Sequence, residues 1–501
     1  MSEELLKQNI ARAQMATMQN KDQAARGKMR QHYHFMAQSG WLNDPNGLIY
    51  FRGKYHFFFQ CNPYGGFWDC MYWGHAVSED MLHWEYLPFA LAPSEPYDDY
   101  PKGGCFSGSA IEHEGKLFLM YTGTSHYGKG IVQTQCIAYS EDGIYFKKYP
   151  GNPVITAPEG IAEDYFRDPK VWRQKDVYYM VCGASRNRHG MALLYKSKDM
   201  LHWDFVNVLA ESRGEWGMMW ECPDLFPLGD KYVLTFSPMG SGDHTSVYMV
   251  GDFDEKTGKF DYSISREIDW GFDYYAPQSF LAPDGRRIMV SWSNEWEWMP
   301  LWKDWGPTYK EGWCGCFNIP REVRMRKDHT LQFIPVQEVE NLRENAVRKE
   351  EIVVEEKEME LTAGDGVCYE LKFMIDLTKT DARQLELVLR CGERKKTAVV
   401  FDFAGGELYV DRSNADGWSR GSSRSVLFLK GKNELDVHIL SDQSSLELFT
   451  DSYQNNHSNN IFALDKQNKL YVRACGGRAV FRKLEAYGLK NCFGTDTSEL
   501  D

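Results

Sequence analysis

Three acidic residues occur in similar short contexts, far apart along the chain. Asp44 lies in WLNDPNG, Asp168 in FRDP and Glu221 in WECPD, each one or two positions before a proline. Two carboxyl groups that flank a glycosidic bond can cleave it, one as nucleophile and one as proton donor. Taken singly, Asp44 is better explained as a turn-capping residue. Asp168 has an equally plausible structural use, since Arg167 could pair with a neighbouring acid and Pro169 sets a turn. Taken together, the three positions favour catalysis.

Glu221 is the hardest of the three to explain as a structural residue. Its neighbours Trp220, Cys222 and Pro223 are apolar. We expect partial desolvation, which favours the protonated carboxyl group and raises its pKa. Other acids in the same pocket would raise it further, as a general acid requires.

The elements that would position these acids are β-hairpins, and the pattern recurs five times before about residue 335. A polar entry leads to an apolar strand, a charged or glycine-containing turn and a second, aromatic-rich strand. The five hairpins begin at Asn43, Phe106, Phe166, Trp220 and Tyr274. Their turns lie near residues 53, 115, 175, 229 and 284, a period of about 55 to 60 residues that predicts a propeller of four-stranded blades.

A second repeat supports this periodicity. SEDMLHW at Ser78 and SKDMLHW at Ser197 are nearly identical, and SEDGIYF at Ser140 is a weaker copy. We interpret them as outer-strand segments of their blades. In a propeller the innermost strands line the central channel, so the three acids at hairpin entries are expected to converge on one pocket.

Composition restricts the class of ligand. A net charge of −14 argues against nucleic acid and against an anionic membrane surface, since both attract basic patches. No apolar run approaches the roughly 20 residues that a membrane span needs. Tryptophan and tyrosine beside carboxylates suit a neutral, hydroxyl-rich ligand such as a sugar.

The cysteines and the N-terminus bear on cofactors and on compartment. The twelve cysteines are scattered without metal-ligand spacing, and we expect neither a metal site, nor a disulfide framework, nor an organic cofactor. Residues 1–30 are charged throughout and lack an apolar signal core, so they predict a solvated helical extension on a cytoplasmic protein.

The length of 501 residues favours two domains. We assign residues 31–337 to the propeller and 338–358, which are charged and lack aromatics, to a linker. Residues 359–492 contain short alternating strands with polar loops, which predict an antiparallel β-sandwich, and 493–501 form a tail. No catalytic residue is assigned to the second domain, which would buttress the propeller or help form dimers. The protein is expected to be a monomer or a homodimer.

The ordered motifs resemble glycoside hydrolase family 32, the β-fructofuranosidases. The blocks WLNDPNG, FRDPK and ECPDLF carry the resemblance, together with QCNPYG at Gln60, FSGS at Phe106, YYAPQSF at Tyr274 and GWCGCFNIPREV at Gly312. It extends from about Phe35 to Leu342. The implied fold is all-β, with an N-terminal five-bladed β-propeller followed by the C-terminal sandwich.

The resemblance also implies roles for individual residues. Asp44 would be the nucleophile, Glu221 the general acid/base, and Asp168 a transition-state stabiliser that Arg167 keeps ionised. The residues implied to line the fructose subsite are Asn43, Gln60, Trp68, Phe106, Ser107 and Arg167, with Tyr275 and Trp296 expected to join them.

The implied activity is retaining hydrolysis of terminal β-D-fructofuranosyl residues from sucrose and short fructo-oligosaccharides. Asp69, Cys70 and Tyr72 replace residues that more often read Gly, Pro and His in sucrose-6-phosphate hydrolases, and Asp69 would repel a phosphate if it pointed into the pocket. Sucrose-6-phosphate hydrolysis and fructosyl transfer at high substrate stay open as alternatives. A non-catalytic carbohydrate-binding propeller is the alternative of another class; it predicts loss of a carboxylate, and all three are present.

Overall fold

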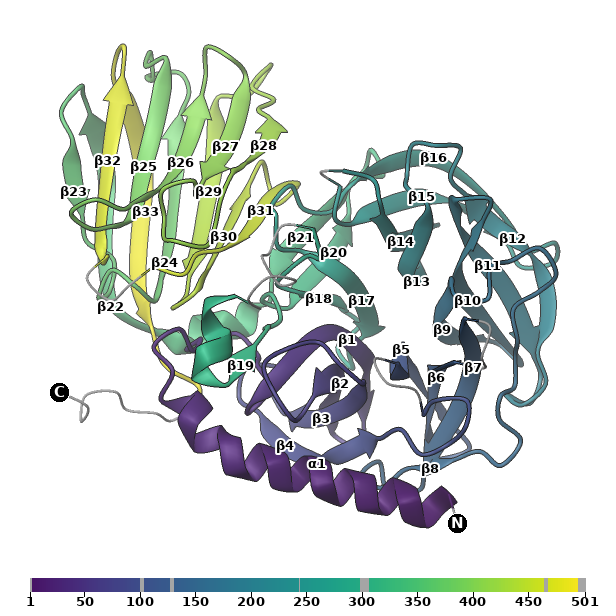
Figure 1. Ribbon diagram of the computed structural model, residues 1–501. Helices are drawn as coiled ribbons and strands as arrows, with labels where there is room; N and C mark the ends of the chain where they lie inside the picture. Colours follow the sequence, from purple (N-terminus) through teal and green to yellow (C-terminus); the bar gives the residue numbers. More distant parts are fainter. Residues whose placement is uncertain are drawn as a thin grey trace.

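We describe a computed structural model of the chain (Figure 1), which covers residues 2–99, 103–126, 130–242, 244–297, 306–463 and 467–493. Of the predicted tail 493–501, all but residue 493 lies outside the described residues. The described residues are nearly all β, with one α-helix among them, near the N-terminus. None of the helices in the described ranges combines the length and the apolar character needed to cross a membrane.

Five antiparallel sheets stand around a common axis as the blades of a propeller (Figure 1). Blade 1 contains β1 (Gly40–Phe51), β2 (Lys54–Asn62), β3 (Tyr72–Ser78) and β4 (Glu85–Leu91). Blade 2 contains β5 (Gly104–His113), β6 (Lys116–His126), β7 (Ile131–Ser140) and β8 (Lys147–Lys148). Blade 3 contains β9 (Phe166–Gln174), β10 (Val177–Arg186), β11 (His189–Ser197) and β12 (Asp204–Glu211).

Blades 4 and 5 complete the ring. Blade 4 contains β13 (Met219–Leu228), β14 (Lys231–Met239), β15 (Val247–Asp254) and β16 (Lys259–Glu267). Blade 5 contains β17 (Tyr275–Leu281), β18 (Arg287–Trp292), β20 (Arg321–Met325) and β21 (Leu331–Pro335). Between β18 and β20 the chain crosses to blade 1, where β19 (Trp313–Cys314) pairs in parallel with β1 and joins the last blade to the first.

Every innermost strand is interrupted by a β-bulge near its start. The register shifts lie between Leu42 and Pro45 in β1, Phe106 and Gly108 in β5, Arg167 and Lys170 in β9, Glu221 and Asp224 in β13, and Tyr275 and Gln278 in β17. Bulges redirect side chains, and they are the positions within a sheet that tolerate proline. The hairpin pattern predicted converging strands, and the bulges turn the acids at their starts toward the axis.

The seven-residue repeats are turns, so the prediction that they form outer strands is wrong. Ser78–Trp84 connects β3 to β4, and Ser197–Trp203 connects β11 to β12. Asp80 accepts hydrogen bonds from the backbone N–H groups of Leu82 and His83, and Asp199 repeats the pattern in blade 3. A short polar side chain that binds the backbone two or three residues ahead stabilises a turn, which explains the repeated sequence.

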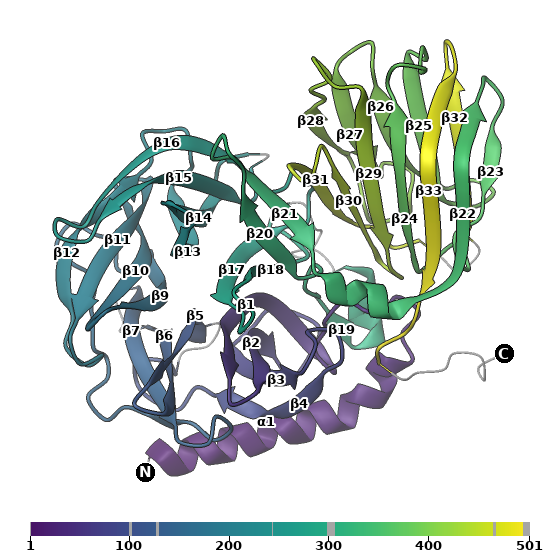
Figure 2. The same ribbon diagram turned by 180° about the vertical axis from the view of Figure 1, so that it is seen from behind.

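The C-terminal domain consists of two packed six-stranded sheets (Figure 2). The first contains β22 (Arg343–Val354), β33 (Ala479–Leu489), β24 (Tyr369–Asp376), β29 (Glu434–Ser441), β30 (Ser445–Thr450) and β31 (Asn455–Asn460). The second contains β23 (Met359–Leu361), β32 (Lys469–Cys475), β25 (Gln384–Cys391), β26 (Thr397–Asp402), β27 (Glu407–Asp411) and β28 (Ser422–Val426). Leucine, isoleucine, valine and phenylalanine side chains fill the space between them.

The stretch predicted as a linker, 338–358, contains regular secondary structure. It starts within the 3-10 helix η2 (Gln337–Leu342) and continues as β22, which pairs with β33 along the edge of the first sheet. Of the twelve residues of β22 only two are buried. An exposed edge strand accepts charged side chains, which is why this strand resembles a linker in composition.

The N-terminal helix α1 (Ser2–Ala25) lies along β4 at the outer edge of blade 1 (Figure 1). It buries Leu6, Ala13 and Ala24 against the propeller. The helix therefore packs on the propeller along one face and is not solvated on all sides.

A buried cluster of charged side chains joins the propeller to the C-terminal domain. The ring nitrogens of His34 lie 2.8 Å from Asp442 Oδ2 and 2.8 Å from Glu447 Oε1, with all three side chains inaccessible to solvent. Arg321 extends the cluster by pairing with Glu447 and Asp269. Burial opposes the charge on His34, but hydrogen bonds to the two carboxylates outweigh it and raise its pKa to about 9.

This cluster makes stability depend on pH. The pKa of His34 rises from 6.5 in the unfolded chain to about 9 in the folded one. The stabilisation of the folded state by the charged His34 is therefore complete below pH 6.5 and is lost as the pH rises through 9. We expect the free energy of unfolding in urea to fall by roughly 3 kcal/mol more in the wild type than in His34→Gln between pH 6.5 and 9.5. Parallel pH profiles for the two proteins would contradict this.

Candidate active site

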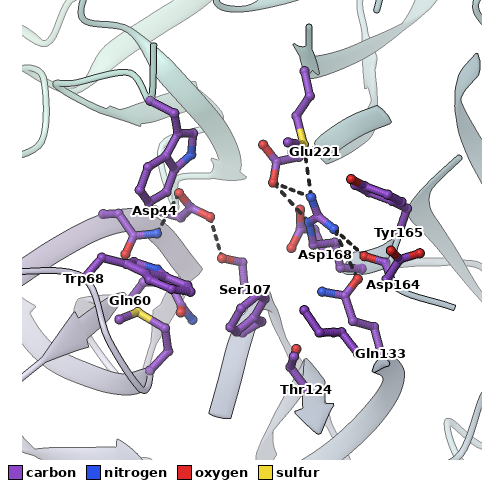
Figure 3. Close-up of a pocket in the computed structure, with 17 residues that line it drawn as sticks. Asp44, Gln60, Trp68, Ser107, Thr124, Gln133, Asp164, Tyr165, Asp168 and Glu221 are labelled. Atoms are coloured by element: carbon purple, nitrogen blue, oxygen red, sulfur yellow. Dashed lines mark hydrogen bonds and ion pairs between the residues drawn. The ribbon is translucent and has the colours of Figure 1, made fainter. Parts of the chain in front are cut away.

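One cavity lies at the propeller axis and contains all three predicted acids (Figure 3). Its volume is about 350 Å³, the size of a site for a small ligand. The predicted site residues that line it are Asn43, Asp44, Gln60, Trp68, Phe106, Ser107, Arg167, Asp168, Glu221 and Trp296. They come from four of the five blades and from the loop that follows β18.

Asp44 lies in the bulge of β1 with its carboxylate held on both sides. Ser107 donates a hydrogen bond of 2.6 Å to Oδ2, and the amide of Asn43 donates one of 3.1 Å to Oδ1. Burial raises the pKa of Asp44 to about 6; the hydrogen bond from Ser107 opposes this shift, and the charge on Glu221 adds to it. The residue is thus a fixed carboxylate that is ionised near neutral pH.

Asp168 lies in the bulge of β9 with a left-handed backbone, at φ 65°. Its Oδ2 accepts a hydrogen bond of 2.9 Å from the backbone N–H of Cys222. The thiol of Cys222 lies 3.6 Å from Oδ2 of Asp168 and 3.6 Å from Oδ2 of Asp44. These two oxygens are therefore no more than twice that distance apart, so the first and third blades place their acids side by side.

Arg167 pairs with Glu221, and this corrects the expectation that it holds Asp168. Its Nε and Nη2 donate hydrogen bonds of 3.0 and 2.9 Å to Oε1 of Glu221. Burial raises the pKa of Asp168; Arg167 opposes this shift, and the charges of Glu221 and Asp44 add to it. Asp168 is therefore not the strongly acidic carboxyl group that a direct ion pair would produce.

The surroundings of Glu221 are more polar than its sequence neighbours predict. Besides Arg167, the hydroxyl of Tyr275 donates a hydrogen bond to Oε2. Tyr275 was expected to line the subsite, but its side chain is buried and it is not among the residues that line the cavity. Its role in the structure is to hold the carboxyl group of Glu221 in position.

Aromatic rings form one wall of the cavity. The ring centroid of Trp68 lies 6.3 Å from that of Phe106 and 6.4 Å from that of Trp296, in edge-on geometry. Trp296 in turn stacks on Trp41 at 6.0 Å, and the indole N–H of Trp41 donates to Asn43. The wall thus offers apolar faces beside the amides of Asn43 and Gln60, an arrangement suited to the C–H and O–H groups of a sugar.

Several lining residues were missed by sequence reasoning. They are Met71, Thr124, Ile131, Gln133, Asp164, Tyr165 and Met239. Gln133 accepts a hydrogen bond from Arg167, and the carbonyl group of Asp164 accepts another. Asp164 and Tyr165 directly precede the FRDP motif, which could have identified them. The others lie outside the innermost strands: Met71 directly precedes β3, and no sequence motif marks the ends of β6, β7 and β14, where Thr124, Ile131, Gln133 and Met239 lie.

Asp69, expected near the leaving group, does not line the cavity. Its carboxylate accepts a hydrogen bond from the backbone N–H of Cys70. In the described part of the chain, the residues close enough to hold a metal ion are His32, Cys368 and Asp442, at the interface between the domains. The oxygens of Asp442 already accept hydrogen bonds from the backbone of residues 32–34.

The arrangement supports acid–base and nucleophilic chemistry on one bound ligand. One acid is fixed by Ser107, another is oriented by Arg167 and Tyr275, and the third lies beside the first. This is the set of groups that a double-displacement glycosidase uses.

Comparison with known proteins agrees with this interpretation. Residues 34–335 match the model of the glycosyl hydrolases family 32 N-terminal domain, and residues 338–488 match that of the family 32 C-terminal domain. A sucrose-6-phosphate hydrolase of Escherichia coli is 37% identical over 90% of this chain and 93% of its own length. A raffinose invertase of Escherichia coli is 36% identical over 89% and 92%. The structure of a Bombyx mori β-fructofuranosidase in complex with sucrose superposes with a TM-score of 0.81 and 32% identity, over 96% of this chain and 98% of the other.

Proposed function

The chain belongs to glycosyl hydrolase family 32, and from that premise we propose that it cleaves terminal β-D-fructofuranosyl residues from sucrose and short fructo-oligosaccharides. The observation that carries the proposal is the meeting of Asp44, Asp168 and Glu221 in one cavity beside an aromatic wall. Family membership makes the chain a glycoside hydrolase, which argues against the alternative of a non-catalytic binding propeller.

In the first step, Asp44 attacks the anomeric carbon of the fructosyl unit, and Glu221 donates a proton to the departing oxygen. A covalent fructosyl ester on Asp44 results, and the leaving sugar departs as an alcohol. The hydrogen bonds from Ser107 and Asn43 leave Asp44 little freedom to rotate, so it is positioned before the substrate arrives.

In the second step, Glu221 removes a proton from water, which attacks the same carbon and releases fructose with retained configuration. Arg167 and Tyr275 keep Glu221 in one orientation for both proton transfers. Asp168 accepts hydrogen bonds from sugar hydroxyl groups, and these shorten as positive charge develops on the ring. We propose that Asn43, Gln60, Trp68, Phe106 and Trp296 form the rest of the fructose subsite.

For the leaving group, we propose an unphosphorylated sugar. Arg167 is the only cationic side chain among the described residues that line the cavity, and it is already paired with Glu221. The exposed carboxylate of Asp164 would repel a phosphate group at the mouth. Sucrose-6-phosphate stays the second candidate because the Escherichia coli relative with 37% identity carries that name.

Initial rates on sucrose, sucrose-6-phosphate, kestose and inulin at equal concentration test the proposal. We expect sucrose to be hydrolysed faster than its 6-phosphate, with fructose as the product. A clear preference for the phosphate would establish the second candidate. Absence of hydrolysis on all four would refute the proposed activity, and oligosaccharide products at high sucrose would reveal transfer.

The acidic limb of the pH profile reports the neighbouring carboxyl groups of Asp44 and Asp168, because burial raises the pKa of both. Since the pKa of Asp44 is about 6, kcat/KM should keep falling as the pH drops below 6 and the nucleophile becomes protonated. Ser107→Ala removes a hydrogen bond that lowers this pKa, so the limb should move to higher pH by about one unit. The test is to measure kcat/KM on sucrose against pH for the wild type and for Ser107→Ala. An acidic limb that does not move, or that moves to lower pH, would argue against Asp44 as the nucleophile.

We further propose a cytoplasmic location and a monomer or homodimer. No disulfide bond joins any of the twelve cysteines, all of which lie in the described part of the chain, and this suits a reducing compartment. Cell fractionation and light scattering test the two statements separately.

A further inference from the structure

One residue of the C-terminal domain, Asn460, contacts a loop that contributes to the catalytic cavity. It is the last residue of β31, the edge strand of the first sheet on the side of the propeller (Figure 2). Asn460 is only 4% exposed, so its amide group must find hydrogen-bond partners within the protein. The proposed mechanism does not use this residue.

The amide of Asn460 binds the two residues that follow β18. Its Nδ2 donates a hydrogen bond of 2.6 Å to the backbone oxygen of Ser293 and another of 2.6 Å to Oδ1 of Asn294. Its Oδ1 accepts a hydrogen bond of 3.1 Å from the hydroxyl group of Ser293. An asparagine side chain offers two N–H donors and one acceptor oxygen, and here all of them are directed at the loop.

These contacts lie where the loop leaves the sheet. β18 ends at Trp292, so the buried backbone of Ser293 and Asn294 lies beyond the strand. The N–H group of Ser293 donates to the backbone oxygen of Cys316 at 2.8 Å, and its carbonyl oxygen accepts from Asn460. Buried backbone groups outside a sheet need other partners, and Asn460 supplies one for this end of the loop.

The same loop carries Trp296, which lines the catalytic cavity. A single residue, Glu295, separates Trp296 from Asn294. Because Trp296 belongs to no strand, the position of its ring depends on how the loop is held at Ser293 and Asn294. A side chain of the second domain therefore holds part of the aromatic wall.

The backbone of Asn460 makes a separate connection to the site. Its N–H group donates a hydrogen bond of 2.7 Å to Oδ2 of Asp273. Asp273 lies two residues before Tyr275, whose hydroxyl group binds Glu221. Since an alanine at position 460 keeps the backbone N–H group, a substitution of the side chain tests the contacts with the loop alone.

We propose that Asn460 is a positioning residue for the fructose subsite, which holds the loop that carries Trp296 and so fixes the position of its ring against the substrate. The inference rests on the proposed function and gives the C-terminal domain a part in it. The competing interpretation is that Asn460 only joins the two domains. That interpretation predicts a less stable protein with normal substrate binding, whereas a positioning role predicts weaker binding in a folded protein.

The test measures kcat and KM for sucrose in Asn460→Ala, with thermal unfolding to check the fold. We expect KM to rise about fivefold to tenfold, because the ring of Trp296 is no longer held in one position against the sugar. The ring would contact the sugar in the ground state and in the transition state alike, so kcat should stay within about twofold. An unchanged KM in the folded variant would overturn the inference.

Asn456→Ala is the matched control. Asn456 is a buried residue of the same strand, and its amide donates to the backbone oxygen of Ile268 in the propeller at 3.3 Å. Ile268 does not line the cavity. This variant also loses an amide contact between the domains, so its thermal stability should fall while KM for sucrose stays within about twofold. An equal rise of KM in both variants would assign the effect to the domain interface as a whole and overturn the inference.

A double-mutant cycle tests whether Asn460 acts through Trp296. If Asn460 changes KM only by holding this ring, its loss should have no further effect once the ring is removed. The double variant Asn460→Ala/Trp296→Ala should therefore have the KM of Trp296→Ala, within about twofold. Single effects that multiply in the double variant would contradict the proposed role.

Asn294→Ala tests the same contact from the propeller side and decides the question if Asn460→Ala does not fold. It removes one of the hydrogen bonds of the Asn460 amide, so KM for sucrose should rise by about threefold. A wild type that does not hydrolyse sucrose would refute the proposed function and with it this role. Hydrolysis by the wild type, combined with an unchanged KM in Asn294→Ala, would overturn the role of Asn460 alone.

Discussion

Asp44→Ala should hydrolyse sucrose about 10⁴-fold more slowly than the wild type, or slower still, because the variant has no group that can form the covalent intermediate. The loss should appear in kcat, since binding of the fructosyl unit also depends on Asn43, Gln60 and the aromatic wall. Steady-state kinetics on sucrose, with thermal unfolding to check the fold, measure the effect.

Asp69→Ala is the matched control for that experiment. It also removes an aspartate from the first blade region, but one whose carboxylate binds the backbone of Cys70 and does not line the cavity. Its rate should stay within about twofold of the wild type, as for an ordinary surface substitution. Comparable losses in both variants would show that Asp44 acts through the fold and is not the nucleophile.

Glu221→Gln should lower kcat on sucrose by about 10³-fold, within the range that general acid catalysis contributes. The amide keeps the shape of the side chain and an oxygen that Arg167 can bind, so the protein should still fold. It cannot donate a carboxyl proton to the leaving oxygen. Hydrolysis of an aryl β-fructofuranoside, whose phenol leaves without protonation, should be slowed much less. The measurement is the ratio of the fold decreases in kcat on the two substrates.

Two results would contradict the assignment of Glu221. One is hydrolysis of sucrose by the variant at the wild-type rate. The other is an equal loss on sucrose and on the aryl substrate, which would indicate a role in binding or in folding. Tyr275→Phe serves as a comparison, because it removes only the hydroxyl group that holds Glu221.

The propeller and the positions of its three acids could be predicted from the sequence because a local signal recurs in each blade. Asp44, Asp168 and Glu221 precede prolines, and a proline inside a strand indicates a bulge. With the hairpin period, this signal places the acids at the starts of inner strands. The bulges themselves were not predicted, although Pro277 in the fifth blade follows the same pattern.

The partners of the acids could not be predicted in the same way. Arg167 is adjacent to Asp168 in the sequence, yet side chains of consecutive strand residues point to opposite faces, and its guanidinium group reaches Glu221 in the next blade. Tyr275 likewise contacts Glu221 from a different blade. Such pairings depend on the angle between blades, which no local sequence pattern encodes. β22 was missed because an edge strand can be as charged as a loop.

The contacts of Asp442 determine when folding of the chain can be completed during its synthesis. The backbone N–H groups of residues 32–34 and the ring of His34 bind this one carboxylate, which leaves the ribosome some 400 residues later. Until then the segment that leads into the first blade lacks its anchor, and Arg321 lacks Glu447. A nascent chain can therefore form its blades early, but the propeller can pack against the C-terminal domain only near the end of translation.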